Sequence, residues 1–128
     1  MAASLLAVVV DCRDPSALAR FWATALAREV AERNSDEFLV RDLTEASTPL
    51  YFMKVPEPKV TKNRLHIDVL TDGPMEDEVR RLADAGAACI EVRQDPDTLS
   101  NPDTWTVMTD PEGNEFCVTS SATLTGWT

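Results

Sequence analysis

The sequence predicts an α+β fold of two β-α-β-β-β modules whose sheets curl around a central cleft. The chain repeats itself: shifted by 59 positions, the apolar run at residues 6–10 falls on residues 65–69, and Pro15 falls on Pro74. A repeat of about 60 residues buries too little apolar surface to be stable alone. We therefore expect the two modules to share a core and to enclose a cleft, which is where a ligand would bind.

Composition indicates one globular domain. At 128 residues, with 44% hydrophobic residues, the chain is expected to form a first module over about 1–55, a connector over 56–63 and a second module over about 64–120. A formal net charge of −10 disfavours binding to nucleic acid and to anionic membrane surfaces. The apolar start is too short for a membrane span and lacks the basic flank of a signal peptide, which predicts a cytoplasmic protein.

The three cysteines of the chain are Cys12, Cys89 and Cys117. Their number is odd and no pair has the C-x-x-C spacing of a zinc knuckle or a redox motif. We expect all three to be reduced thiols.

The first module begins with a β-branched run at residues 5–11, which is typical of a buried strand. Asp14 followed by Pro15 predicts a helix N-cap with proline at the first helical position. The helix expected over 15–26 has one apolar stripe at helical spacing, formed by Leu18, Phe21, Trp22, Ala25 and Leu26. Strands are expected over 29–33, 37–43 and 49–55, separated by polar turns.

The connector contains Pro56 and Pro58, which exclude a helix or a central strand there because proline has no backbone N–H. The second module is expected to run as a strand over 64–70 and a helix over 75–85, with Gly86 suited to a left-handed cap. The remaining strands are expected over 88–93, 104–109 and 115–120, interrupted by a loop over 94–103. The tail from Ser121 is polar apart from Leu124 and Trp127.

Three segments carry a family resemblance: VVVDCRDPSALARFWATAL, KNRLHIDV and TDPEGNEFCV. With the repeated element order, they resemble the glyoxalase-like branch of the vicinal oxygen chelate superfamily, which includes glyoxalase I, bleomycin-resistance proteins, fosfomycin-resistance enzymes and extradiol dioxygenases. The turn from Asp110 to Asn114 is the most specific piece, because Gly113 and Asn114 tolerate positive φ. The resemblance covers nearly the whole chain and implies a ligand cavity between modules, often in a homodimer.

The resemblance also implies metal ligands in the catalytic members, and these are only partly present. In metal-binding relatives one ligand is a histidine on the first strand, and the resemblance puts Ala7 at that position. The corresponding position of the second module is His66. The final carboxylate position is Cys117, with Glu115 two residues earlier on the same strand. Two candidate donors fall short of the three protein ligands expected at a catalytic metal site. We therefore expect no metal cofactor, with a divalent metal completed by Glu115 as the alternative.

Strand alternation predicts a polar cluster. It places His66 and Asp68 on one face of their strand, and Glu115 and Cys117 on one face of theirs. The residues of opposite parity are expected to cover the helix: Leu65, Ile67 and Val69. If both strands line the cleft, His66 is the candidate general base, assisted by Asp68 or Glu115. The alternative is that His66 is packed by hydrogen bonds and Cys117 is a small buried apolar residue.

Further ligand contacts are expected from Trp105 and one of Tyr51 or Phe52, which could stack on a flat ligand, and from Cys117. Arg64 lies in a basic run with Lys59 and Lys62, which could attract a ligand carboxylate or phosphate. Ordinary packing of the aromatics and a solvated connector are the competing interpretations.

These observations favour a protein that binds a small metabolite or natural product in the inter-module cleft, with acid–base chemistry that needs no metal. If it is an enzyme, a glyoxalase-like lyase or isomerase is expected. Two alternatives remain open: a metal-dependent lyase or dioxygenase-type enzyme, and a non-catalytic sequestering protein of the bleomycin-resistance type.

Overall fold

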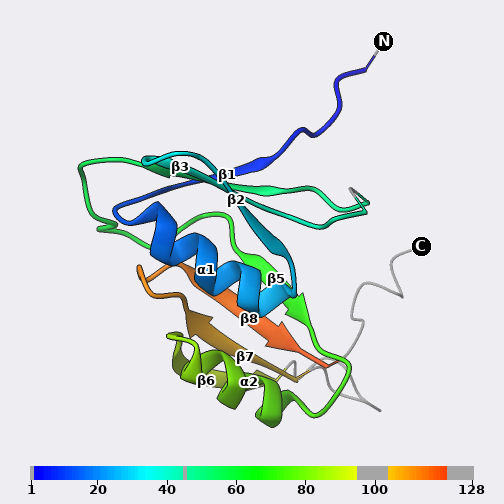
Figure 1. Cartoon of the computed structure of the whole chain (residues 1–128). Coiled ribbons are helices and arrows are strands. Elements are labelled where there is room, and N and C mark those ends of the chain that lie inside the picture. The colour runs from blue at the N-terminus through cyan, green and yellow to red at the C-terminus, as the bar shows by residue number, and fades with distance from the viewer. Residues whose placement is uncertain (1, 45, 95–103, 121–128) are drawn as a thin grey trace. The chain divides into compact units, whose positions relative to one another are not determined.

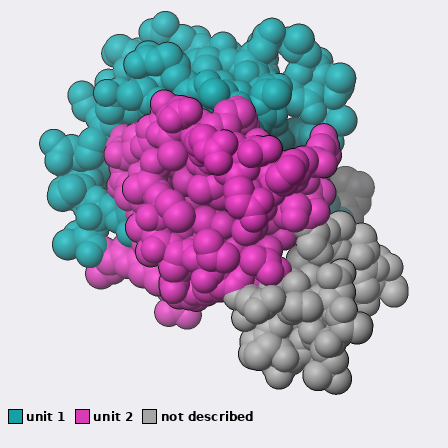
Figure 2. Space-filling view, turned by 90° about the horizontal axis from the view of Figure 1, so that it is seen from below, with its two compact units in different colours: residues 1–60 teal, residues 61–128 magenta. Residues whose placement is uncertain are grey.

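The computed structural model describes residues 2–44, 46–94 and 104–120. It gives two compact units, Met1–Val60 and Thr61–Thr128, which are coloured separately in Figure 2. The described residues of each unit form one four-stranded mixed sheet and one helix, and the order of elements is the same in both (Figure 1). The predicted two-module α+β fold is confirmed, with open sheets. The predicted cleft between the modules stays a prediction.

The first unit contains, in order, β1 (Val8–Cys12), α1 (Pro15–Leu26), β2 (Glu29–Asn34), β3 (Glu37–Arg41) and β4 (Leu50–Lys54). Its sheet has the order β1-β4-β3-β2, with β1 parallel to β4 and the other pairs antiparallel. The Asp14 carboxylate accepts a hydrogen bond from Ala17 N at 3.1 Å, which caps α1 as predicted. The apolar stripe of α1, apart from the half-buried Leu26, is buried, and α1 packs on β3 and β4, where Val40 and Phe52 are fully buried.

The second unit contains β5 (Ile67–Leu70), α2 (Met75–Asp84), β6 (Ala88–Gln94), β7 (Thr104–Thr109) and β8 (Glu115–Thr119). Its sheet repeats the pattern as β5-β8-β7-β6, with β5 parallel to β8. Helix α2 contacts β6, β7 and β8 and covers the face that carries Met108, Phe116 and Val118. The opposite face of this sheet, which we call the open face, carries the side chains of alternate residues.

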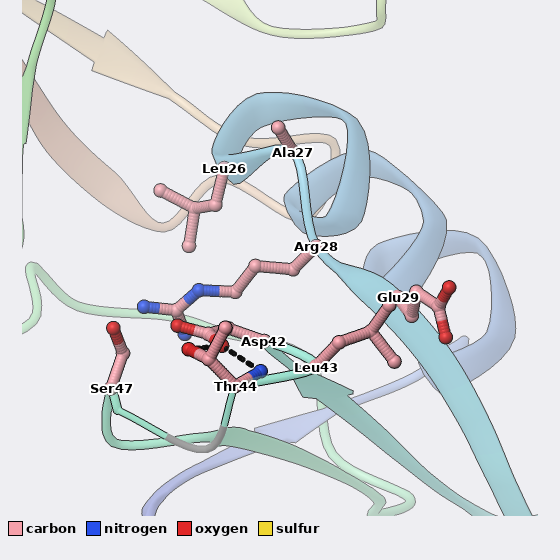
Figure 3. Close-up of a pocket in the computed structure, with 8 residues that line it drawn as sticks. All are labelled: Leu26, Ala27, Arg28, Glu29, Asp42, Leu43, Thr44 and Ser47. Atoms are coloured by element: carbon pink, nitrogen blue, oxygen red, sulfur yellow. Dashed lines mark hydrogen bonds between the residues drawn. The ribbon is translucent and has the colours of Figure 1, made fainter.

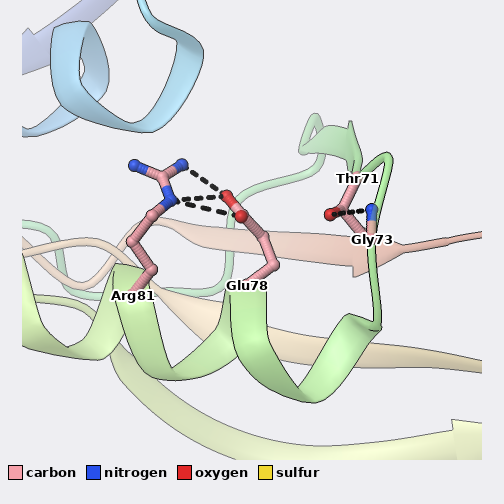
Figure 4. A network of polar contacts seen from close by, with 4 residues as sticks. All are labelled: Thr71, Gly73, Glu78 and Arg81. Atoms are coloured by element: carbon pink, nitrogen blue, oxygen red, sulfur yellow. Dashed lines mark hydrogen bonds and ion pairs between the residues drawn. The ribbon is translucent and has the colours of Figure 1, made fainter.

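Helix α2 has no side-chain N-cap, but its first turn is acidic, which complements the positive end of the helix dipole. Arg81 forms an ion pair with Glu78 one turn earlier, and the Thr71 hydroxyl accepts a hydrogen bond from Gly73 N at 3.3 Å in the preceding turn (Figure 4). The hydrogen bond stabilises the turn that precedes α2, and the ion pair links successive turns of the helix.

The internal repeat extends to an uncommon backbone conformation. Ala27, which follows α1, has φ 52°, and Gly86, its counterpart after α2 under the 59-residue shift, has φ 123°. Gly86 therefore has the positive φ that its sequence position suggests.

The first strand of each module begins later than predicted: β1 at Val8 and β5 at Ile67. Leu65 lies ahead of β5 and is 85% exposed, so its predicted packing against the helix is wrong, whereas Val69 is 5% exposed and Ile67 is half-buried. The reason is that, among the described residues, β5 is the end strand of its sheet, and its pairing with β8 starts at Ile67 opposite Phe116.

The loop over 94–103, apart from Gln94 at the end of β6, and the tail from Ser121 with Leu124 and Trp127 lie outside the described residues. Among the residues that are described, no helix is both long and apolar enough to cross a membrane.

Candidate functional site

Three of the predicted site residues meet on the open face of the second sheet. His66 directly precedes β5, Asp68 is the second residue of that strand, and Cys117 lies opposite Asp68 in the parallel pairing with β8. One donor atom from each side chain lies within 4.8 Å of the others. The structure thus brings together a ring nitrogen, a carboxylate oxygen and a sulfur, and we call this group the His66–Asp68–Cys117 cluster.

Asp68 is the shared partner within the cluster. His66 Nε2 lies 3.3 Å from Asp68 Oδ1, with the two side chains 45% and 63% exposed. The Cys117 thiol forms a hydrogen bond to Asp68. Burial raises the pKa of this thiol, and the charge of Asp68 raises it further, while Arg93 and Lys62 act in the opposite direction. Cys117 is therefore a protonated hydrogen-bond donor and not an activated thiolate nucleophile.

Glu115, the remaining predicted acid, is engaged elsewhere. Its Oε2 accepts a hydrogen bond from Asn63 N at 3.2 Å, and the Asn63 amide donates to Asn114 Oδ1 at 2.8 Å. Sequence reasoning did not identify Asn63, because its partners lie 51 and 52 positions away in the chain. The carboxylate of Glu115 thus joins the connector to β8.

Trp105 provides an apolar surface beside the cluster. It lies in β7 opposite Thr119, and Leu70 of β5 lies opposite the same threonine on the other side. Thr119 is two residues after Cys117 in β8, so Leu70 and Trp105 lie on the same face of the sheet as Cys117. Leu70 is exposed and Trp105 is half-buried. The open face therefore combines a polar corner with an aromatic and aliphatic strip.

Tyr51 lies on the other unit, in β4. Its hydroxyl accepts a hydrogen bond from Arg33 Nη1 at 3.0 Å and donates one to Glu37, and Arg33 Nε lies 3.5 Å from Glu37 Oε2. The hydrogen bond and the charges of this group raise the pKa of Arg33. Sequence reasoning missed Arg33 and Glu37, although their position on either side of the β2–β3 turn was a usable signal. Arg64, also predicted as a ligand contact, is exposed two residues before His66.

A pocket of about 530 Å³ lies in the first unit and contains none of the predicted site residues (Figure 3). It is lined by Leu26, Ala27, Arg28, Glu29, Asp42, Leu43, Thr44 and Ser47. Arg28 Nη1 donates to Thr48 O at 3.0 Å, and Asp42 accepts from Thr44 N at 2.6 Å. The bonds from Thr44 lower the pKa of Asp42, with a smaller contribution from Arg28. Arg28 and Asp42 are thus both hydrogen-bonded to residues of the loop that follows β3.

The cluster fits the metals of the resembled family poorly. It offers one nitrogen, one oxygen and one sulfur donor, whereas hard cations such as Mn²⁺ prefer oxygen ligands. Zinc accepts such a mixed set, but metal binding needs the thiolate, and the pKa of Cys117 is shifted toward the protonated form. The position of Ala7 contributes no donor.

Comparisons with known proteins agree with the fold. The model of the glyoxalase-like domain matches residues 7–119. The comparison with curated proteins found no match.

Several solved structures are similar. A glyoxalase/bleomycin resistance protein/dioxygenase family enzyme from Burkholderia phytofirmans PsJN has 22% identity and a TM-score of 0.69, covering 91% of this chain and 97% of that one. The fosfomycin resistance protein FosX from Listeria monocytogenes, complexed with Mn(II) and 1S,2S-dihydroxypropylphosphonic acid, has 13% identity and a TM-score of 0.74 over 100% of both chains. A glyoxalase/bleomycin resistance protein/dioxygenase from Alicyclobacillus acidocaldarius has 15% identity and a TM-score of 0.63, over 95% and 96%. At these identities the likeness concerns the fold.

Proposed function

Because the chain belongs to the glyoxalase-like family, whose model spans residues 7–119, we propose that it binds a small organic molecule on the open face of the second sheet without a metal. The observation that carries the proposal is the His66–Asp68–Cys117 cluster, with donor atoms within 4.8 Å, beside the apolar strip of Leu70 and Trp105. A few convergent polar groups beside aromatic and aliphatic side chains are typical of the lining of small-molecule sites.

The chemistry of the cluster selects the polar end of the ligand. The Asp68 carboxylate is more than half exposed and already accepts the Cys117 thiol, so its free lone pairs can accept further N–H donors. A cationic or neutral N–H group gains a charge-assisted hydrogen bond to Asp68, whereas the charge of Asp68 repels a carboxylate. Trp105 provides the face on which a flat apolar body stacks.

The same geometry supports metal-independent acid–base chemistry. His66 is the group that would accept a proton from the bound molecule, and Asp68, 3.3 Å from its Nε2, would stabilise the imidazolium that forms. The protonated Cys117 thiol would hold Asp68 in place and would not attack the ligand. An isomerase or lyase needs such a proton transfer, whereas a sequestering protein needs only the binding surface.

Three isosteric aromatic probes test the proposal: benzamidine, benzamide and benzoate, which carry positive, neutral and negative head groups. The chain has a single histidine, so the ring signals of His66 in an NMR titration report directly on the site. We expect saturable shifts in the order benzamidine, benzamide, benzoate, and loss of the preference for benzamidine in Asp68→Asn. Unmoved His66 signals with all three probes, or an unchanged preference in Asp68→Asn, would overturn the proposal.

A second candidate is a zinc-dependent enzyme, favoured by the same close approach of three donors. Titrating the protein with zinc separates the two candidates. Binding of one zinc per chain at submicromolar free metal, lost in both His66→Ala and Cys117→Ser, would replace the metal-free proposal with this one.

A further inference from the structure

The turn between β7 and β8 is held together by a buried carboxylate. Asp110 is 4% exposed, and its Oδ1 accepts hydrogen bonds from Glu112 N at 2.9 Å, Asn114 N at 2.9 Å and Asn114 Nδ2 at 3.1 Å. Gly113 has φ 85°, which closes the turn. Because the amide of Asn114 donates to Asp110, its oxygen Oδ1 is oriented as an acceptor on the other side.

The connector binds to this preformed turn at one residue. Asn63 donates through its side chain to Asn114 Oδ1 at 2.8 Å and through its backbone N–H to Glu115 Oε2 at 3.2 Å. The two acceptors are consecutive in the chain, so the two bonds fix both the position and the orientation of the Asn63 peptide. We call this arrangement the Asn63 clamp.

The clamp lies three residues before His66. Strand pairing begins only at Ile67, so His66 is positioned between the clamp on one side and the start of β5 on the other. We propose that the Asn63 clamp positions His66 for binding, and that Glu115 is a positioning residue and not an acid or base. The clamp rests on the proposed function, because it holds His66 in place at the same binding site.

Two substitutions distinguish a positioning role of the Glu115 side chain from a role of its negative charge. Glu115→Gln keeps a side-chain oxygen that can accept the Asn63 N–H, and Glu115→Ala removes it. Glu78→Ala is a matched control, because Glu78 also holds a polar contact in this unit, an ion pair with Arg81 within α2 (Figure 4).

We expect Glu115→Ala to move the His66 ring signals toward those of a free histidine and to weaken benzamidine binding roughly tenfold. Glu115→Gln should remain near the unmodified protein in both measurements, and Glu78→Ala should change neither. Asn63→Ala, which keeps the backbone N–H but loses the side-chain bond, should give a smaller change of the same kind.

The outcomes distinguish this inference from the proposed function. If Gln and Ala at position 115 weaken binding equally while the His66 signals stay in place, Glu115 contacts the ligand through its charge and the clamp is wrong. If Glu115→Ala lowers Tm without moving the His66 signals, its role is only structural and the clamp is again wrong. If the His66 signals respond as expected but no probe binds to any variant, the clamp holds and the proposed function fails.

Discussion

Asp68 lies directly opposite Cys117 in the parallel pairing of β5 and β8, and its carboxylate is the group that both Cys117 and His66 contact. The parallel register, which links two strands distant in sequence, therefore creates the cluster. A single acidic side chain therefore lies against both neighbours, and most of the predictions below depend on it.

Cys117 should react slowly with iodoacetamide, because burial and Asp68 raise its pKa and the thiolate is the reactive form. In Asp68→Asn the negative charge is gone, so the pKa should fall and alkylation at a fixed mildly alkaline pH should become faster. The exposed Cys89 is an internal control whose rate should not change. Peptide mass spectrometry at several pH values measures both; an unchanged or slower Cys117 rate in Asp68→Asn would contradict the assignment.

The protein purified without a chelator should carry no stoichiometric transition metal, because Ala7 supplies no donor and metal binding would need the Cys117 thiolate, whose pKa is raised by burial and by Asp68. Elemental analysis checks this. About one zinc, iron, nickel or manganese per chain, lost on His66→Ala, would show that the expectation is wrong.

Replacing His66 by alanine should weaken benzamidine binding while leaving the fold intact. The side chain is 45% exposed, so the free energy of unfolding should change by no more than about 0.5 kcal/mol. Leu82→Ala in the fully buried core of the same unit provides the contrast, with an expected loss of about 2–5 kcal/mol. Denaturant unfolding and probe titration of both variants are the measurements. A collapse in stability of His66→Ala with unchanged affinity per folded molecule would make His66 structural.

Two glycines of the second unit should respond differently to alanine. Gly86 has φ 123°, and a Cβ there would lie 3.3 Å from Pro111 Cγ, so Gly86→Ala should destabilise the unit by roughly 1–2 kcal/mol. A Cβ at Gly73 would have no neighbour within 4 Å, so Gly73→Ala should be close to neutral. Thermal unfolding compares the two; equal Tm values would contradict the strain assigned to Gly86.

The sequence was most informative where local chemistry decides the structure. The bounds of α1 agree with the prediction because Asp14 caps the helix and Pro15 starts it. The shared face of His66 and Asp68 followed from strand alternation. The position of Leu65 could not be predicted, because the start of an edge strand depends on where its partner begins. The role of Glu115 was equally hidden, since its partner Asn63 is 52 residues away.

The parallel pairing of β5 with β8 also determines when the site can exist during synthesis. The two strands are separated by about 50 residues, which a ribosome adds in roughly 3–10 s. During that interval His66 and Asp68 have been made but Cys117 and the Asn114 turn have not, so a nascent chain ending before residue 115 contains α2 and no partner for β5. Such long-range pairing is also slow to form after release. The cluster is therefore absent from truncated products and would serve as a marker that the second unit has been completed and folded.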